Sequence, residues 1–205
     1  MNRTEISKRI LGFDCTVTPG IHYLITNITP IFESLLRATD SAVDYHGFYP
    51  SAPFTKEGAP FRVIRIPPGS IIIDVLKTIG PYAASVGIVG LCGSLSERYP
   101  VSSFVCPSWV TESQAPDKRL PLNPKYLNGP CICQMDGLVQ EEAFYRHLAT
   151  LGIDLVDMES WYLRRFTPKD TPVHVCSVVS DMPLISPFYE NQPFDIDIQT
   201  LISLL

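Results

Sequence analysis

The chain has 205 residues, of which 45% are hydrophobic and 18% charged, and its formal net charge is −5 at pH 7. This length and composition predict a single domain, residues 1–205, with a sizeable core, and exclude an intrinsically disordered chain. The acidic balance argues against a protein that coats nucleic acid or an anionic membrane. No apolar run approaches the ~20 residues that span a bilayer, and residues 1–8 lack a signal-like stretch, so we expect a cytoplasmic protein.

The predicted elements alternate along the chain. In the first half they are a strand over residues 21–25, a helix over 31–37, a loop over 47–60, a strand over 61–66 and a helix over 70–79. The residue clusters Pro67-Pro68-Gly69 and Gly80-Pro81 mark the ends of the second strand and the second helix. Ser70 is the predicted N-cap of that helix.

The second half continues the alternation. Its predicted elements are a strand over 85–89 that runs into a small-residue turn over 90–94, a strand over 104–106, a loop over 111–130, a strand over 131–133, a helix over 141–151, a strand over 153–156, a helix over 157–166 and a strand over 173–179. Such alternation predicts a three-layer α/β/α fold with a mainly parallel central sheet. Ligands bind such sheets at the carboxyl ends of the strands, where residues 90–94, 157–159 and 180–181 are expected.

The six cysteines do not follow a metal-binding or disulfide pattern. Their spacings contain no Cys-x-x-Cys pair, and zinc sites and disulfide frameworks depend on regular spacing. We therefore interpret them as buried free thiols. The sequence also contains no dinucleotide fingerprint and no P-loop, so we expect no metal and no cofactor.

Three acidic side chains follow predicted strands, namely Asp157, Glu159 and Asp181. Asp181 comes directly after an apolar run, where desolvation would raise its pKa and suit it to general acid catalysis near neutral pH. A carboxylate at a strand-to-helix junction, such as Glu159, can accept hydrogen bonds from two sugar hydroxyls. The alternative is structural, with Asp157 and Glu159 capping the following helix and Asp181 capping a turn.

Several motifs resemble the nucleoside phosphorylase and nucleosidase superfamily, and in particular the catalytic domain of AMP nucleosidase. Two are specific: Val156-Asp157-Met158-Glu159 is similar to the family's Val-Asp-Met-Glu, and residues 179–185 are similar to its Val-Ser-Asp-x-Pro-Met-Ile. Residues 90–95, Gly-Leu-Cys-Gly-Ser-Leu, resemble its Gly-x-Cys-Gly-Gly-Leu turn. Thr18-Pro19 with residues 23–27 resembles the start of the domain, so the resemblance covers most of the chain.

The resemblance implies hydrolysis of the N-glycosidic bond of a purine nucleotide or nucleoside, converting an AMP-like substrate to free base and ribose 5-phosphate. It implies that Asp181 protonates, or hydrogen bonds to, the purine N7 while Ser180 orients its carboxyl group. It further implies that Glu159 binds the ribose hydroxyls and that Met158 packs against the sugar. The remaining predicted substrate-binding residues are Asn27, Gly69, Ser70, Cys92 and Gly93. The superfamily assembles as dimers, trimers or hexamers, so we expect a homo-oligomer.

Two substitutions relative to the family bear on the substrate. Phosphorylases carry Arg and Ser where this chain has Ile88 and Leu91, which argues against phosphorolysis because neither side chain can hold an anion. AMP nucleosidases place Lys at the position of Leu91. One alternative is therefore a nucleosidase for an unphosphorylated substrate, of the methylthioadenosine, S-adenosylhomocysteine or futalosine type. The other is a catalytically silent nucleotide-binding protein of the same fold.

Other residues are candidates for roles that the motifs leave open. Arg62 and Arg65 flank an apolar strand and could reach a 5′-phosphate through a bidentate contact. The aromatic residue that stacks on the base in the family aligns near Leu138, and Phe188 or Tyr189 could replace it. The candidate for a water-activating acid near the amino terminus is Asp14, and His22 or His46 could complete the site of a neighbouring subunit.

Overall fold

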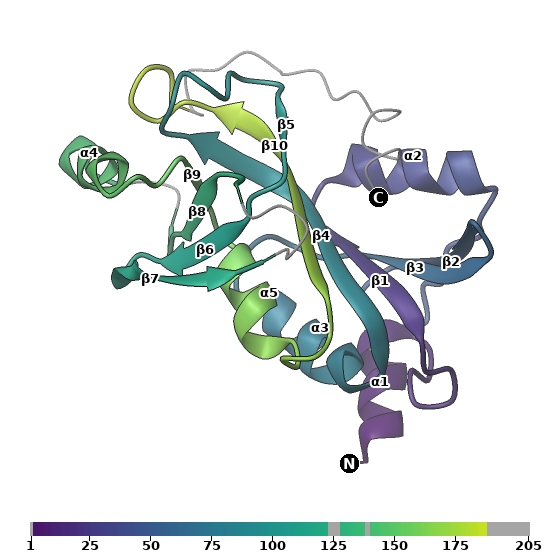
Figure 1. The fold of residues 1–205 in the computed structure, drawn as a ribbon. Coiled ribbons are helices and arrows are strands. Elements are labelled where there is room, and N and C mark those ends of the chain that lie inside the picture. The colour runs from purple at the N-terminus through teal and green to yellow at the C-terminus, as the bar shows by residue number, and fades with distance from the viewer. Residues whose placement is uncertain (1, 123–127, 138–139, 188–205) are drawn as a thin grey trace.

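The computed structural model describes residues 2–122, 128–137 and 140–187, and a mixed sheet runs through the middle of them (Figure 1). Over these residues the sheet has ten strands in the order β2-β3-β1-β4-β9-β8-β6-β7, with β10 paired to β4 and β5 to β10. The strands are β1 (Ile21–Thr26), β2 (Ser51–Lys56), β3 (Ala59–Arg65), β4 (Ala83–Ser94), β5 (Phe104–Val105), β6 (Trp109–Glu112), β7 (Ala115–Pro121), β8 (Cys131–Gln134), β9 (Leu155–Asp157) and β10 (Val173–Asp181).

The long strand β4 organises the sheet. It runs parallel to β1 on one side and to β10 on the other. At its carboxyl end, residues Gly93 and Ser94 pair with β9 in the antiparallel direction. The pairs β1–β3, β6–β8 and β8–β9 are also parallel, whereas β2–β3, β6–β7 and β5–β10 are antiparallel. The predicted α/β class is confirmed, with a sheet that is mostly but not purely parallel.

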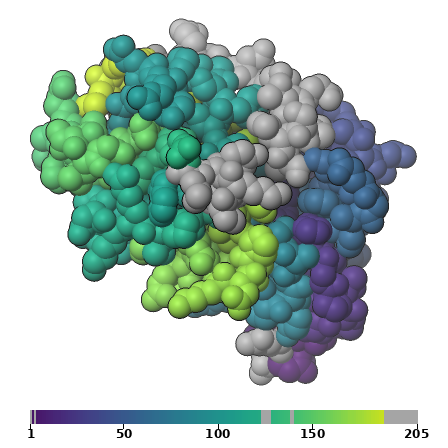
Figure 2. Space-filling model, viewed as in Figure 1, coloured from purple at the N-terminus to yellow at the C-terminus, as the bar shows by residue number. Residues whose placement is uncertain are grey.

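Helices cover both faces of the sheet, which confirms the three-layer arrangement. The helices are α1 (Arg3–Leu11), α2 (Thr29–Thr39), α3 (Ile72–Ile79), α4 (Glu142–Thr150) and α5 (Ser160–Phe166), with a short 3₁₀ turn at Gly80–Tyr82. Helices α1, α3 and α5 lie side by side on one face (Figures 1 and 2), and α2 lies on the other. None of the helices in the described ranges is long and apolar enough to span a membrane.

Apolar side chains on each helix face explain this packing. Helix α3 buries Ile72, Val75, Leu76 and Ile79, which recur at the three- and four-residue spacing of one helix face. Helix α2 buries Ile31, Phe32 and Leu35 against the opposite face of the sheet. The six cysteines are all free, five of them buried and Cys106 half-buried, as the sequence predicted.

Two segments predicted as loops contain strands, so those predictions were wrong. Residues 47–60 include β2 and the start of β3, joined by a tight turn at Glu57 (φ 52°) and Gly58 (φ 82°). Pro53 is tolerated in β2 because that strand lies at the sheet edge. Residues 111–130 include the end of β6 and all of β7, a largely exposed edge strand whose polar side chains conceal its pattern. Helix α1 was not predicted.

Two local predictions also need correction. Ser70 is not an N-cap: helix α3 begins at Ile72, and its N-cap position is Ile71, which makes no side-chain capping hydrogen bond. Residues 90–94 are not a turn, because β4 continues as a strand through Ser94. Its pairing with β10 on one side and β9 on the other supplies the hydrogen bonds that extend it.

Candidate functional site

Strand pairing brings the two acidic motifs to opposite sides of β4. Asp181 at the end of β10 pairs with Gly93, and Gly93 pairs on its other side with Val156 of β9. Asp157 and Glu159 directly follow Val156 in the chain, so both motifs border the same short stretch of β4. Because β9 is antiparallel to β4, Asp157 and Glu159 reach this place from the opposite direction, and not from a parallel strand end as the sequence suggested.

Glu159 is buried and held in one orientation by two donors from other strand ends. Its side chain is 2% exposed. The Oε1 atom accepts hydrogen bonds from the backbone N–H of Gly69 at 2.5 Å and from Nδ2 of Asn27 at 3.2 Å. Although Glu159 occupies the N-cap position of α5, its side chain makes no capping hydrogen bond. The capping alternative is therefore wrong for Glu159, whose carboxylate instead faces residues that follow β1 and β3.

The turn after β3 fits closely around this carboxylate. Pro67 and Pro68 have no backbone N–H, so Gly69 supplies the first amide donor of the turn, and its φ of +90° favours glycine. The Met158 Cε atom lies 3.6 Å from the point that a Cβ on Gly69 would occupy. Asn27 Oδ1 is buried without a hydrogen-bond partner among the described residues, which leaves an acceptor for a bound ligand.

Asp157 has a different environment from Glu159. Its Oδ2 atom accepts a 3.0 Å hydrogen bond from the N–H of Ser160 and another from the Ser160 hydroxyl, so the capping interpretation is correct for Asp157. Burial and then the nearby Glu159 carboxylate raise its pKa to about 8. Burial also raises the pKa of Glu159, while its hydrogen bonds from Gly69 and Asn27 oppose that rise. A proton on Asp157 relieves the repulsion, so Glu159 carries the charge of the pair.

Replacing Asp157 with Asn is expected to change how stability depends on pH. The pKa of Asp157 is raised above its unfolded value of about 3.9, so folding favours the protonated form. Its contribution to stability is complete below pH ~4 and is lost as pH rises through about 8. Between pH ~4 and about 8, the free energy of unfolding measured in urea should fall more steeply with rising pH for the wild type than for Asp157→Asn. Parallel curves for the two proteins would contradict the raised pKa; exposed Asp170→Asn is the control.

Asp181 ends β10 and is 7% exposed. The Ser180 hydroxyl lies 2.7 Å from Asp181 Oδ1 and 3.2 Å from the carbonyl oxygen of Cys92, to either of which it can donate. Burial raises the pKa of the Cys92 thiol well above its usual range, and the charges of Asp157 and Asp181 raise it further. The Cys92 thiol is therefore not an activated nucleophile. A Cβ at Gly93 would approach side-chain atoms of Pro183 and Val156 to 3.0 Å, so this position needs a small residue.

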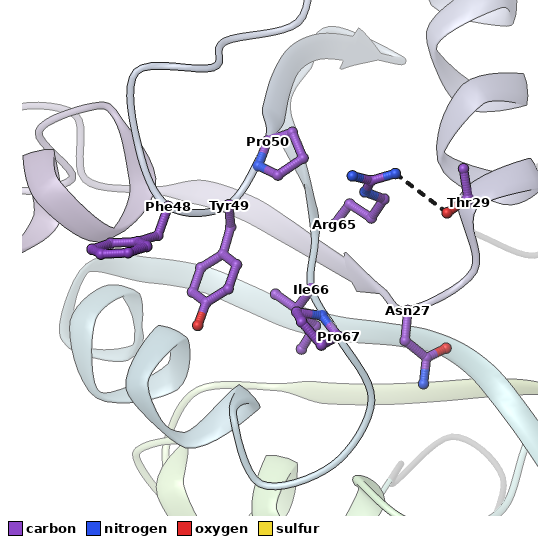
Figure 3. Close-up of a pocket in the computed structure, with 8 residues that line it drawn as sticks. All are labelled: Asn27, Thr29, Phe48, Tyr49, Pro50, Arg65, Ile66 and Pro67. Carbon is purple, nitrogen blue, oxygen red and sulfur yellow. Dashed lines mark hydrogen bonds between the residues drawn. The ribbon is translucent and has the colours of Figure 1, made fainter.

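A pocket of about 380 Å³ adjoins Asn27 at the carboxyl ends of β1 and β3 (Figure 3). Its polar wall contains Arg65, whose Nη1 donates to Thr29 Oγ1 at 3.3 Å, and the Arg65 guanidinium also lies 5.8 Å from the ring centre of Phe32. The other lining residues are Phe48, Tyr49, Pro50, Ile66 and Pro67. Thr29 and the loop residues Phe48, Tyr49 and Pro50 were not predicted as site residues. The sequence showed only that this segment lacks a regular apolar spacing.

The two candidate arginines have different environments. Arg62 lies 3.8 Å from Asp44, donates to Ser51 Oγ at 2.8 Å and covers the ring of Phe13 at 3.9 Å. These contacts give Arg62 a structural role in joining β3 to its neighbours. Arg65 is the arginine that faces the pocket (Figure 3).

The remaining predicted residues lie outside this cluster or outside the described residues. Ser70 is exposed beyond the Gly69 turn. Asp14 accepts hydrogen bonds from Thr16 and lies 3.9 Å from Lys8, in the loop that precedes β1, so it is at the opposite end of β1 from Asn27. His22 bonds to Ser85 within the sheet, whereas His46 is exposed. Leu138, Phe188 and Tyr189 are outside the described residues.

Comparison with solved structures identifies the fold. The 5′-methylthioadenosine/S-adenosylhomocysteine nucleosidase of Colwellia psychrerythraea, in complex with adenine, matches with a TM-score of 0.66 and 14% identity over 80% of this chain and 83% of its own. AMP nucleosidase from Bacteroides thetaiotaomicron matches with a TM-score of 0.66 and 18% identity over 90% of each chain. A futalosine hydrolase mutant of Helicobacter pylori matches at 0.63 and 12%, over 78% and 89%.

The sequence itself is distant from these proteins. No family model matches the chain, and no curated protein matches it. The structural similarity therefore establishes that the chain has the fold of the purine nucleosidases, as the motifs suggested. A fold hosts many activities, and the activity of a given chain depends on the residues of its site.

Proposed function

We propose that this chain is a cytoplasmic purine N-ribosyl hydrolase with an AMP-like substrate, which it converts to free base and ribose 5-phosphate. The observation that carries the proposal is the buried Glu159 carboxylate, oriented by Gly69 and Asn27, on the other side of β4 from the Ser180–Asp181 pair. A carboxylate beside the sugar and an acid beside the base stabilise the two charges that develop when a purine N-glycosidic bond is cleaved. The nucleosidase fold supports the same assignment.

Asp181 is proposed as the catalytic general acid. Breaking the bond leaves negative charge on the purine, and a proton delivered to N7, or a hydrogen bond there, makes the base a better leaving group. The Ser180 hydroxyl lies 2.7 Å from Asp181 Oδ1, and this hydrogen bond is proposed to orient the carboxyl group toward the base. Only the part of this interaction that strengthens in the transition state lowers the barrier.

Glu159 is proposed to bind the ribose hydroxyls. Its Oε1 is engaged by two protein donors, so Oε2 is the oxygen that can accept from the sugar. Its negative charge also stabilises the positive charge that develops on the ribose in an oxocarbenium-like transition state. Met158, which lies against the Gly69 turn, is proposed to pack against the sugar; Cys92 and Gly93 are proposed to form the base side of the site.

The Arg65 pocket supports a phosphorylated substrate. It adjoins Asn27, the residue that holds Glu159, and it offers a guanidinium and a hydroxyl, Arg65 and Thr29, to an anion. This charge compensates for Leu91, where AMP nucleosidases have Lys. The second candidate, a nucleosidase for a methylthioadenosine-, S-adenosylhomocysteine- or futalosine-type substrate, is favoured by the apolar Leu91 itself. A silent nucleotide-binding protein has no need of a positioned acid beside the base.

The test is to incubate the protein with AMP, adenosine, methylthioadenosine, inosine and futalosine, each with and without inorganic phosphate, and to measure the released base by chromatography. Base release from AMP without phosphate is the expected result. Release that requires phosphate would identify a phosphorylase and overturn the assignment of hydrolysis. A preference for methylthioadenosine or futalosine would support the second candidate. A folded protein that releases no base would contradict the proposal.

Replacing Arg65 with Ala is expected to affect only the phosphorylated substrate. Loss of a charge-assisted hydrogen bond to phosphate costs about 1.5–3 kcal/mol, so kcat/KM for AMP should fall about 10- to 100-fold. Turnover of adenosine should not change. Arg37→Ala, on the exposed side of α2, is the matched control. Equal losses with both substrates would remove Arg65 from the phosphate site.

We also infer a homo-oligomer, a dimer, trimer or hexamer. Two aromatic side chains of the loop beside the Arg65 pocket, Tyr45 and Phe48, are 74% and 80% exposed, and we expect them to pack against a partner subunit. Sedimentation analysis should give a mass above that of one chain, and Phe48→Ser should lower it.

A further inference from the structure

We propose that Cys106 and Cys176 form an oxidation site, at which a hydroperoxide converts the two thiols to a reversible disulfide between β5 and β10. The pair is separate from the nucleosidase site proposed above, and the inference does not depend on that function. The two cysteines are neighbours by strand register, share one face of the sheet and differ in exposure.

The register between β5 and β10 makes the two cysteines cross-strand neighbours. Ser177 pairs with Val105 and Val178 with Phe104 in antiparallel orientation. Extending this register by one residue beyond the end of β5 places Cys106 opposite Cys176. The N–H of Val179 donates to the carbonyl of Ser103 at 2.9 Å. Alternation from that bond makes Cys176–Cys106 a non-hydrogen-bonded pair, for which Cα atoms lie about 4.5 Å apart. This separation is within the range of disulfides.

The two side chains also point to the same side of the sheet. Both belong to the apolar cluster under α2, in which Cys176 is buried and Cys106 packs partly buried against it. Cys176 is 6% exposed, so Cys106 is the sulfur that a small oxidant in water reaches first. Cys131 and Cys133, by contrast, lie on the same strand, β8.

The chemical environment of the pair also makes Cys106 the first of the two thiols to be oxidised. A hydrogen bond from the Cys176 thiol lowers the pKa of Cys106 to about 7, against the opposing effect of burial. By contrast, burial raises the pKa of Cys131 to about 11 and that of Cys133 to about 12. Cys106 is therefore the thiol with appreciable thiolate at neutral pH, and the thiolate is the reactive species.

The reaction balances with one equivalent of peroxide. The Cys106 thiolate attacks a peroxide oxygen, the O–O bond breaks, and the leaving oxygen departs as water or alcohol after taking up a proton, which gives a sulfenic acid on Cys106. The Cys176 sulfur then attacks the Cys106 sulfur, the S–O bond breaks, and water leaves with the proton of Cys176. Two thiols are oxidised by two electrons and the peroxide is reduced. A dithiol reductant reverses the change.

The experiment treats the folded, fully reduced protein with one equivalent of hydrogen peroxide and measures the intact mass and the linked peptides. The expected result is the loss of two hydrogen atoms, a peptide that links Cys106 to Cys176, and recovery with dithiothreitol. The matched variants separate the two roles. Cys106→Ala should show no loss of hydrogen mass. Cys176→Ser, whose hydroxyl keeps a hydrogen-bond donor for Cys106, should give a sulfenic acid on Cys106 that a 1,3-diketone traps. Cys131→Ala should behave as the wild type.

Two results would overturn the proposal. One is a loss of two hydrogen atoms that persists in Cys106→Ala, which would assign the disulfide to other cysteines. The other is oxidation of Cys106 in the wild type to an adduct or a higher oxide with no linked peptide, which would mean that Cys176 does not resolve it. A urea-unfolded sample serves as a reference, because without the strand register the link should lose its selectivity.

Discussion

Asp181→Asn is expected to lower kcat for base release by about 10²–10⁴-fold, the contribution typical of a general acid. The amide has nearly the shape of the carboxyl group, and its oxygen can still accept the hydrogen bond that Ser180 donates. It cannot release a proton to the purine as an acid does. The variant should therefore fold, bind substrate with a similar KM and fail in the chemical step.

The measurement is steady-state release of base together with a thermal melt. Asp117→Asn, on the exposed edge strand β7, is the matched control and should retain full activity. A substrate with a good leaving group needs less protonation, so a nitrophenyl riboside should lose less activity than a purine nucleotide. Near-normal turnover of AMP in a folded Asp181→Asn protein would exclude Asp181 as the general acid.

Glu159→Gln is expected to lower kcat/KM by about 10²–10⁴-fold without lowering stability. Each charge-assisted hydrogen bond to a ribose hydroxyl contributes about 1.5–3 kcal/mol, and two such bonds are at stake. The Gln oxygen can still accept from Gly69 and Asn27, but its NH₂ group faces the sugar with donors where acceptors are needed. The charge near the developing oxocarbenium ion is also lost.

Stability separates this role from a structural one. Burial raises the pKa of Glu159, which means that its ionised form costs folding free energy, so a neutral Gln should leave the melting temperature unchanged or higher. Glu33→Gln on the exposed side of α2 is the control. Parallel losses of activity and stability in Glu159→Gln would indicate that the carboxylate is a structural element and not a sugar ligand.

The sequence predicts the alternation of strands and helices because burial requires apolar side chains at regular spacing. It also predicts the acids that follow the apolar strands. The run Val173–Val179 is buried at every position except His174, and α3 has a single apolar face. Strands β2 and β7 could not be predicted from the sequence because they lie at the edges of the sheet. Edge strands tolerate polar residues and proline, which hide the apolar pattern of a strand. The direction of β9 depends on pairing between distant segments, which local pattern does not specify.

Within the candidate site, the residue types of the motifs identified Glu159 and Asp181, but not their environments. That Asp157 caps α5 while Glu159 turns away could not be predicted, since both follow the same strand and either can occupy an N-cap. Likewise, Arg62 and Arg65 are three residues apart on one strand. Only the positions of Asp44 and Thr29, which come from other segments, separate a structural guanidinium from one that lines a pocket.

The position of both acidic motifs beside β4 has a consequence for how this site can evolve. Asp181 and Val156 are paired to the same residue, Gly93, so the distance between the base side and the sugar side is fixed by the spacing of hydrogen-bonded strands, about 4.8 Å each. The pocket lining, in contrast, comes from the loop before β2, from the end of β3 with the two residues after it, and from Asn27 after β1 and Thr29 at the start of α2. For the proposed hydrolase, substitutions in this lining would exchange one 5′ group for another while the spacing of the two acidic motifs stays the same, so substrate range would vary more readily than the reaction.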